Sequence, residues 1–251
     1  MNAPVQADSF GIIVIGDEIL SGRRRDRHFD ALGGMLRERG FGVAWLRILP
    51  DDPEYLASEF TRTMAAPNPV FCCGGIGATP DDHTRACAAR AAAVPLTLHP
   101  GAVAEIEARF GADAYPNRIH MAELPKGCEL IPNPYNRIPG FSINRHYFLP
   151  GFPDMAHPMA GWVLDTHYRE GGIAERQRAV RVRGVTESSL MDLMQQLVVQ
   201  FPDARLFSLP RLGPEFQIEL GFRGRGDLEA PFAALVAALE ARGVTFDPLQ
   251  D

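Results

Sequence analysis

Lysine is nearly absent from this chain of 251 residues, which has one lysine, Lys126, against 24 arginines. Positive charge is also in deficit, because 31 acidic residues face 25 basic ones and the formal net charge is −6. The residues up to Glu170 hold 20 acids and 16 bases, net −4, and the remainder holds 11 and 9, net −2. Nucleic acids and anionic membranes select clustered positive charge. The charge therefore predicts neither a nucleic-acid partner nor a membrane partner.

Long apolar runs and paired cysteine motifs are missing as well. No stretch approaches the roughly 20 apolar residues of a membrane span, and the first nine residues lack the basic and apolar regions of a signal peptide. The four cysteines, Cys72, Cys73, Cys87 and Cys128, form no CxxC or Cys/His zinc spacing. These features predict buried thiols in a reducing compartment, and so a cytoplasmic protein. HExxH and GxSxG motifs are also absent, which argues against a zinc protease and a serine hydrolase.

Short apolar runs alternate with helical spacing through the first two thirds of the chain. Strands are expected over 10–15, 43–49, 70–73, 129–131 and 147–149, and helices over 27–39, 84–93, 101–110 and 154–168. Asp52 followed by Pro53 has the form of a helix cap and first turn, and opens a further helix through Met64. Segments 74–79 and 132–140 are expected as loops. This alternation predicts a three-layer α/β/α domain with a mostly parallel sheet over residues 8–170. In such a fold, ligands bind at the carboxyl ends of the strands.

Gly171 and Gly172 form the best linker candidate, and the order of the expected strands and helices changes after them. Strands are expected over 179–182, 205–209, 216–222 and 244–246, and helices over 189–201 and 227–242. The resulting β-α-β-β-α-β order is the ferredoxin-like arrangement. Residues 173–251 are therefore predicted to form a small α+β domain.

The clearest chemical signal is the glycine-rich segment Gly74-Gly-Ile-Gly-Ala-Thr-Pro-Asp-Asp82, which follows a predicted strand directly. Backbone amides of such a turn, together with a helix N-terminus, can bind phosphate. The segment is neither a dinucleotide fingerprint nor a P-loop, because the third glycine and the GK[ST] triplet are missing. The adjacent carboxylates of Asp81 and Asp82 suit a hard cation such as Mg²⁺ beside phosphates. The alternative is a structural turn in which one of the two caps the helix.

Other loops at the expected ligand edge also carry acids. Asp17 and Glu18 follow the first strand, and Asp51 and Asp52 follow the second. Together with the pair Asp81 and Asp82, they are expected to share one rim. Three arginines at 23–25 offer a phosphate clamp, and the segments 133–140 and 149–153 are further candidate ligand loops.

Four of these segments together resemble the molybdopterin-binding domain family, which includes the MoaB and MogA proteins of molybdenum-cofactor biosynthesis and the N-terminal domain of the competence/damage-inducible protein CinA. They are Gly16 to Gly22, Gly74 to Asp82 with Thr84, Asn133 with Pro139-Gly140-Phe141, and Leu149-Pro-Gly-Phe-Pro153. The resemblance implies a MoaB/MogA-like fold and a phosphate and pterin or nucleotide pocket lined by Gly75, Gly77, Thr79 and Asp82. Asp51 and Glu18 match further acids of the family. Ala78 and His83 depart from its pattern, and the amidase domain of many CinA proteins has no counterpart here, so amidase activity is not expected.

The predicted site combines the loops and the resemblance. The catalytic residues are Asp82, Asp51 and Glu18, the metal ligands are Asp81 and Asp82, and ligand contacts are expected at Gly16, Asp17, Ser21, Gly22, Gly74, Gly75, Gly77, Thr79, Asn133, Pro139, Gly140, Pro150 and Gly151.

Two functional hypotheses follow. The first is an enzyme that acts on a phosphoanhydride with Mg²⁺ or another divalent cation, either a pyrophosphatase for a nucleotide such as ADP-ribose or FAD, or an adenylyltransferase for molybdopterin. The second is a non-catalytic module that binds a pterin or an adenine nucleotide. A third reading, an assembly protein with a purely structural glycine turn, stays open. The family resemblance also implies a homo-oligomer, a dimer or trimer.

Overall fold

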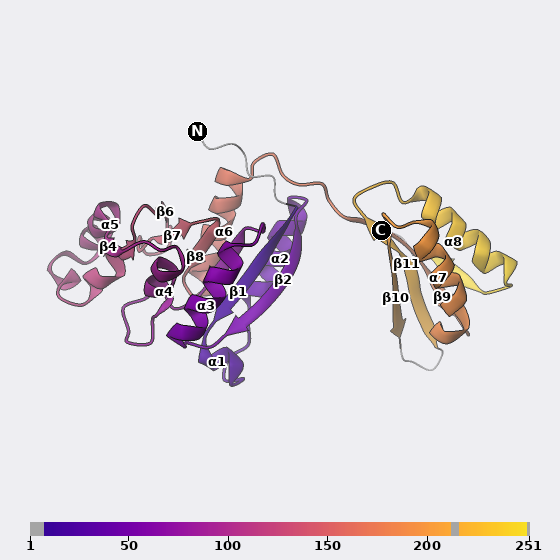
Figure 1. The fold of residues 1–251 in the computed structure, drawn as a ribbon, viewed down its shortest axis with the longest axis horizontal. Helices are drawn as coiled ribbons and strands as arrows, with labels where there is room; N and C mark the ends of the chain where they lie inside the picture. Colours follow the sequence, from indigo (N-terminus) through magenta and orange to yellow (C-terminus); the bar gives the residue numbers. More distant parts are fainter. Residues whose placement is uncertain (1–7, 212–215, 250–251) are drawn as a thin grey trace. The chain divides into compact units, whose positions relative to one another are not determined.

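The computed structural model describes residues 8–211 and 216–249 and divides the chain into two compact units between Gly172 and Ile173 (Figure 1). We call the part before the division unit 1 and the part after it unit 2. No helix within the described parts is long and apolar enough to cross a membrane.

Unit 1 is built on a six-stranded sheet of order β2-β1-β3-β8-β7-β6. Its strands are β1 (Ser9–Ile15), β2 (Gly42–Leu49), β3 (Val70–Cys73), β6 (Glu129–Ile131), β7 (Gly140–Ile143) and β8 (His146–Leu149). The first four strands in that order are parallel, and β7 is antiparallel to both of its neighbours. β1 and β3 are apolar without alternation because both of their faces are buried. The sheet is mostly parallel, as the sequence predicted.

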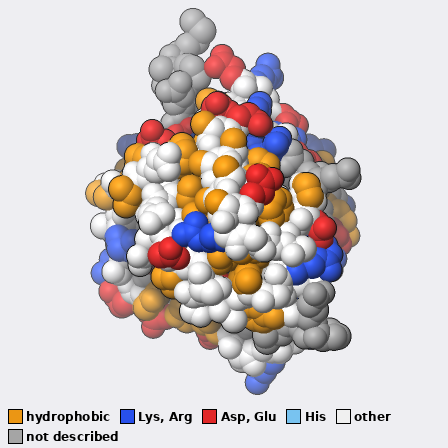
Figure 2. Space-filling view, turned by 90° about the vertical axis from the view of Figure 1, so that its right-hand side faces the viewer, with side chains coloured by type: hydrophobic (Ala, Val, Ile, Leu, Met, Phe, Trp, Pro, Cys, Tyr) orange, Lys and Arg blue, Asp and Glu red, His pale blue; other side chains and the backbone are white. Residues whose placement is uncertain are grey.

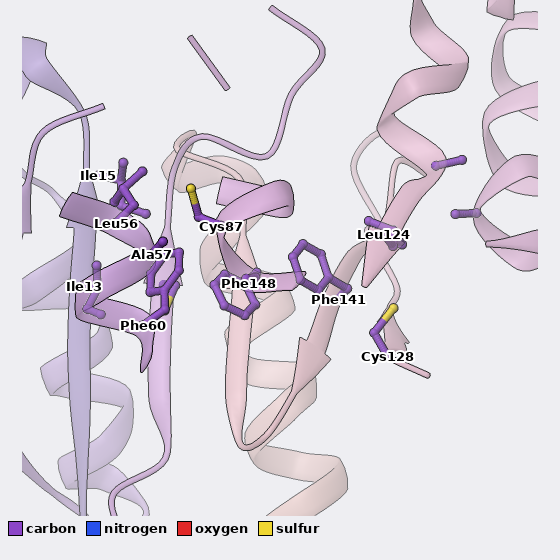
Figure 3. Packing of buried hydrophobic residues seen from close by; sticks show 14 of the residues in the cluster. Ile13, Ile15, Leu56, Ala57, Phe60, Cys87, Leu124, Cys128, Phe141 and Phe148 are labelled. Atoms are coloured by element: carbon purple, nitrogen blue, oxygen red, sulfur yellow. The ribbon is translucent and has the colours of Figure 1, made fainter. Parts of the chain in front are cut away.

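Helices cover both faces of this sheet. They are α1 (Asp17–Leu20), α2 (His28–Glu38), α3 (Pro53–Met64), α4 (Thr84–Ala91), α5 (Pro100–Phe110) and α6 (Pro153–His167). One core joins Leu56 and Phe60 of α3 to Ile13 and Phe148 of the sheet, as Figure 3 shows. The second core joins α2 and α6 to the opposite sheet face. The three-layer α/β/α architecture is therefore confirmed.

The cap of α3 follows the sequence prediction. The Asp52 carboxylate accepts a hydrogen bond from the Tyr55 N–H at 2.7 Å, and Pro53 occupies the first turn. Such a cap satisfies an N–H group that the helix itself leaves without a partner.

The structure differs from the sequence prediction in three segments. Residues 17–20, expected as a loop, form the single turn α1, and residues 140–143 form β7. The strands β4 (Leu96–Leu98) and β5 (Glu123–Pro125) form a small antiparallel pair. Between them in the chain lie α5 and two 3₁₀ turns, Gly111–Ala114 and Arg118–Ala122. The strand β7 has only four residues and follows a proline-rich segment, so the sequence pattern did not indicate a strand there. Its place is set by packing across the sheet, where the Phe141 and Phe148 rings stack at 4.6 Å between centroids.

Unit 2 has its own antiparallel sheet of order β10-β11-β9-β12. Its elements are β9 (Arg176–Arg183), the 3₁₀ turn Glu187–Leu190, α7 (Met191–Gln200), β10 (Arg205–Arg211), β11 (Gln217–Gly224), α8 (Glu229–Ala241) and β12 (Phe246–Pro248). A separate core of residues such as Val180, Leu193, Leu220 and Leu235 lies between the sheet and the two helices. The predicted β-α-β-β-α-β order is confirmed.

Candidate functional site

The topology of unit 1 brings five loops to one edge of the sheet. Strands β1, β2, β3 and β8 are parallel, so the segments that follow them leave at the same edge. β6 runs in the direction of β8, because both are antiparallel to β7. The segments 16–22, 50–52, 74–83, 132–139 and 150–152 therefore share this carboxyl edge, which we call the carboxyl rim.

The glycine turn after β3 requires its first two glycines. Gly74 and Gly75 have φ values of 117° and 66°, in the region that L side chains rarely adopt. A Cβ on Gly74 would lie 2.4 Å from the Ile15 carbonyl oxygen, and one on Gly75 would lie 2.3 Å from Thr84 Oγ1. The Thr84 hydroxyl donates to the Gly74 carbonyl at 3.0 Å and ties the turn to the start of α4. The backbone is thus held in one tight conformation.

The amides of this turn are available to an anion. Within the described residues, the N–H groups of Gly75, Ile76 and Gly77 have no hydrogen-bond acceptor. Consecutive N–H groups before a helix are the usual elements of a phosphate-binding nest.

Asp82 holds the second half of the turn. Its Oδ2 accepts hydrogen bonds from the Thr79 N–H at 2.8 Å and from the Thr79 hydroxyl. A Cβ on Gly77 would lie 2.5 Å from the same oxygen, so only glycine fits beside it without a shift. Asp82 therefore shapes the turn, whereas Asp81 is exposed. His83 stands at the N-cap position of α4 and makes no side-chain cap bond.

Acids from three loops meet beside this turn. The Asp17 N–H donates to Asp51 Oδ2 at 3.0 Å, and the Asp51 N–H donates to Asp17 Oδ1 at 3.3 Å. Partial burial raises the pKa of Asp51. The Asp17 N–H opposes this, and repulsion from Asp17, Glu18 and Asp81 adds to it. One oxygen of each carboxylate in the Asp17–Asp51 pair lies outside the reciprocal hydrogen bonds. The charges of Asp17, Glu18 and Asp81 thus disfavour the charged form of Asp51, whereas side-chain hydrogen bonding lowers the pKa of Asp81.

Four further predicted residues lie at the ends of β1 and β2, in the turn or cap that follows each strand. Asp52 belongs to the cap of α3, and the Ser21 N–H closes the α1 turn onto the Asp17 carbonyl at 2.8 Å. Ser21 and Gly22 are exposed, and Gly16 is buried, at the end of β1.

Asn133 organises its own loop. It is 5 % exposed, and its Nδ2 donates to Asn136 Oδ1 at 2.8 Å and to the Ile138 carbonyl at 3.0 Å. Its Oδ1 accepts from the Tyr135 N–H at 3.0 Å. Pro139 and Gly140 are buried, and a Cβ on Gly140 would lie 2.4 Å from the Phe148 carbonyl oxygen. In this structure these three residues shape the rim.

The turn after β8 lies against the glycine turn. A Cβ on Gly151 would lie 3.5 Å from the Gly74 Cα, and the Gly74 N–H donates to the Leu149 carbonyl at 3.0 Å. The Gly151 carbonyl in turn lies 3.2 Å from Nε2 of the buried His28. Pro150 and Gly151 thus border the glycine turn directly.

Sequence reasoning missed one positioning residue, Arg85. Its guanidinium is buried and donates to the Gly77 carbonyl at 2.8 Å and to the Glu123 carbonyl at 3.0 Å. Burial lowers the pKa of this side chain. Arg85 therefore ties the glycine turn to the start of β5. In a chain whose basic residues are almost all arginine, no local pattern distinguishes it.

A divalent cation fits the chemistry of the rim but needs ligands from outside the protein. Carboxylate oxygens are the donors that Mg²⁺ prefers. Within residues 8–211 and 216–249, no group of three or more His, Cys, Asp or Glu side chains is arranged to hold a metal ion unaided. Mg²⁺ usually keeps waters and substrate phosphates in its shell, so this donor set is compatible with it.

The carboxyl rim and the mostly parallel sheet define an α/β protein with a candidate anion site. The family described as "Probable molybdopterin binding domain" matches residues 11–168, and the chain belongs to that family.

Individual relatives agree with this assignment. A CinA-like protein of Citrifermentans bemidjiense is 31% identical over 214 residues, covering 78% of this chain and 52% of its own. The chain therefore spans about half the length of this relative. Protein Ta0487 of Thermoplasma acidophilum is 27% identical over 234 residues, with 87% and 88% covered. The crystal structure of a CinA protein of unknown function from Thermoplasma acidophilum superposes with a TM-score of 0.58 at 28% identity, covering 63% of this chain and 97% of its own.

Proposed function

We propose that the carboxyl rim of unit 1 binds a pterin or an adenine nucleotide, and that with the help of a divalent cation it hydrolyses the phosphoanhydride of a dinucleotide such as ADP-ribose or FAD, in which water splits the bond between the two phosphates. The observation that carries this proposal is the convergence of Asp17, Glu18, Asp51 and Asp81 beside a turn with unpartnered amides. Carboxylates that repel one another repel phosphates too, and a cation between them relieves both repulsions. Such a pyrophosphatase needs only one dinucleotide and water as substrates, whereas an adenylyltransferase needs both ATP and a pterin.

The protein's own groups divide the work. The N–H groups of Gly75 to Gly77 would hold a phosphate and the negative charge that develops on it during cleavage. Asp51 and Asp81 would hold the cation, and Asp82 with Arg85 keeps the turn in shape. A bound divalent cation would neutralise the bridging phosphates.

The experiment supplies the purified chain with ADP-ribose or FAD, with Mg²⁺ or Mn²⁺, and measures release of AMP. Asp51→Asn and Asp81→Asn should each reduce turnover on the order of 100-fold, the size expected when one positioned group is lost. Asp113→Asn makes the same change at an exposed side chain in the first 3₁₀ turn and should leave turnover intact. Full activity in both rim variants would refute the site.

A metal-free measurement tests the cation separately. Because Asp51 is destabilised in its charged form, Asp51→Asn should raise the melting temperature at pH 7 without metal. The gain should shrink when Mg²⁺ is added, since the cation relieves the same repulsion in the wild type. An unchanged gain would argue against a metal at the rim.

Two other readings give different results in the same assays. Membership of a molybdopterin-binding family favours a pterin ligand, and adenylyl transfer would appear as pyrophosphate release only when ATP and molybdopterin are both present. A non-catalytic module would bind its ligand in calorimetry and turn over none of these compounds. Mass spectrometry of whatever co-purifies with the protein would identify the ligand.

The proposal includes a cytoplasmic homo-oligomer. All four cysteines are free and buried, which suits a reducing compartment. Light scattering of the purified chain distinguishes a monomer from a dimer or trimer.

A further inference from the structure

The sheet of unit 2 has one face without helices. Along β9 and β11, side chains such as Val180 and Leu220 point to α7 and α8 and form the core. Because side chains alternate along a strand, their neighbours point to the other side, which we call the open face. The open face carries, by register, Ala179, Arg181, Arg183, Arg205, Phe207, Leu209, Arg211, Gln217, Glu219, Gly221, Arg223 and Asp247. In Figure 1, α7 and α8 lie together on one side of this sheet.

Positive charge is concentrated on the open face. Five of the nine arginines that follow Glu170 lie there. Among the described acids, Glu219 and Asp247 lie there. Each of the two contacts one arginine, with Arg183 to Asp247 at 2.6 Å and Arg211 to Glu219 at 3.2 Å. Figure 2, which shows the molecule from the right-hand side of Figure 1, has acidic, basic and apolar side chains mixed over that side. The net charge of −2 after Glu170 conceals this asymmetry.

Two arginines oppose each other directly on neighbouring strands. Arg205 of β10 is the register partner of Arg223 of β11, and both are exposed. Like charges directly opposite in an antiparallel pair destabilise the sheet. Arg181 on the same face is the register partner of Glu219 on one side and Asp247 on the other, and its Nε is buried with no hydrogen-bond partner among the described residues. An anion that contacts Arg205 and Arg223 would remove the repulsion between them.

The centre of the open face is apolar and closely packed. Gly221 and Ala179 are register partners, Ala179 is 5 % exposed, and a Cβ on Gly221 would lie 2.6 Å from the Ala179 Cβ. Phe207 is the partner of Gly221 on the other strand and is partly buried, and Leu209 follows it with 54% of its surface exposed. Ala179 and Gly221 are buried, so the exposed part of the Phe207 ring is the surface on which a planar group can stack.

We infer that the open face of unit 2 binds single-stranded nucleic acid. Phosphates would contact the exposed Arg205 and Arg223, and a base would stack on Phe207. Arginines that track a phosphate backbone next to an aromatic side chain are the combination by which exposed sheets bind single strands. An acidic protein partner would satisfy the arginines but gives Phe207 no special part.

The experiment measures fluorescence anisotropy of labelled 12-nucleotide RNA, single-stranded DNA and duplex DNA titrated with the full chain. The single strands should bind more tightly than the duplex, and affinity should fall as salt rises, because bound cations are released from the strand. Phe207→Leu should weaken binding roughly tenfold, within the range for loss of one stacked base.

Charge variants separate specific contacts from general electrostatics. Arg205→Gln and Arg223→Gln should weaken binding and reduce the salt dependence, while their melting temperature stays equal to the wild type or rises. Arg242→Gln removes the same charge at the end of α8, where Arg242 pairs with Asp192, and should leave binding unchanged.

Three results would overturn the inference. The first is no binding of any single strand at low salt. The second is an equal loss of affinity in Arg205→Gln and Arg242→Gln. The third is an affinity for duplex DNA and for heparin equal to that for the single strands. The last would mean a general polyanion surface in which stacking plays no part. The rim variant Asp51→Asn should bind the oligonucleotides like the wild type, so this test is independent of the proposed activity of unit 1.

Discussion

His146 shows how a single buried side chain responds to its surroundings. It begins β8 and is fully buried, with Nε2 2.9 Å from Thr63 Oγ1 and Nδ1 3.1 Å from the Asn144 carbonyl oxygen. Burial lowers the pKa of His146 to about 4, against the hydrogen bond to Asn144, which raises it. The imidazole is therefore neutral at neutral pH.

The shift predicts how the stability of unit 1 depends on pH. The pKa of His146 is lower in the folded state than the ordinary value of 6.5, so the unfolded chain binds more protons between about pH 4 and 6.5. The stabilisation is complete above pH 6.5 and is lost as the pH falls toward 4, by up to about 1.4 kcal/mol per pH unit. Urea unfolding of the wild type and His146→Gln across this range measures it. The variant should be less stable at pH 7 but show a shallower slope, whereas the exposed His120→Gln should keep the wild-type slope.

Residue types predicted the candidate acids, but their roles depend on contacts. The sequence marked Asp52, which precedes Pro53, as a helix cap, but it did not distinguish the roles of Asp51, Asp81 and Asp82. In the structure Asp52 caps α3 and Asp82 accepts two hydrogen bonds from Thr79, while repulsion from Asp81 helps to raise the pKa of Asp51. Their assignment as catalytic or metal-binding residues stays a prediction.

The glycine turn is the element on which the candidate site depends. Its sequence predicted a tight turn, and the structure adds the reason for Gly75, namely a positive φ together with the closeness of Thr84 Oγ1. That closeness depends on α4 packing back over the end of β3, which no local pattern reports.

A substitution in this turn tests the argument. Gly75→Ala should destabilise unit 1 by about 2 kcal/mol or more, because the left-handed backbone costs 1–2 kcal/mol and the contact with Thr84 adds to it. Ligand binding at the rim should be lost as well. Gly127→Ala also has a positive φ, of 84°, but no atom lies within 4 Å of its Cβ. Gly127→Ala should lose only the free energy that the left-handed backbone costs. Thermal unfolding of the two variants measures the difference. Equal losses in the two variants would contradict the role of the Thr84 contact.

Other elements escaped sequence prediction for a similar reason. β7 is four residues long and follows a proline-rich segment, and β4 and β5 have three residues each. Strands this short contain too few residues to show alternation, and their backbone groups find partners only once distant segments meet.

At the scale of the whole molecule, the chain consists of two units with separate cores. Among the described residues, the core cluster of unit 2 consists of residues after Ile173, and the four strands of its sheet pair with one another.

The separation predicts that residues 173–251 fold alone. The isolated segment should show cooperative thermal unfolding by circular dichroism, with modest stability because a domain of this size buries a limited core. Leu220→Ala, in the centre of that core, should cost about 2–5 kcal/mol and abolish the transition. The exposed Leu209→Ala should leave it nearly unchanged. A non-cooperative melt of the unaltered segment would show that the two units need each other to fold.

The sequence by itself determined the class of the protein. Alternating apolar runs predicted the mostly parallel sheet and the β-α-β-β-α-β unit, because strand and helix periods are local properties of a chain. Glycines and acids directly after strands pointed to the carboxyl rim. Tertiary structure alone decided that Asp17, Glu18 and Asp81 lie close enough to repel Asp51, that Arg85 holds the glycine turn, and that five arginines share the open face of unit 2. These depend on distances between residues far apart in the chain, which arise only when the sheets and helices pack.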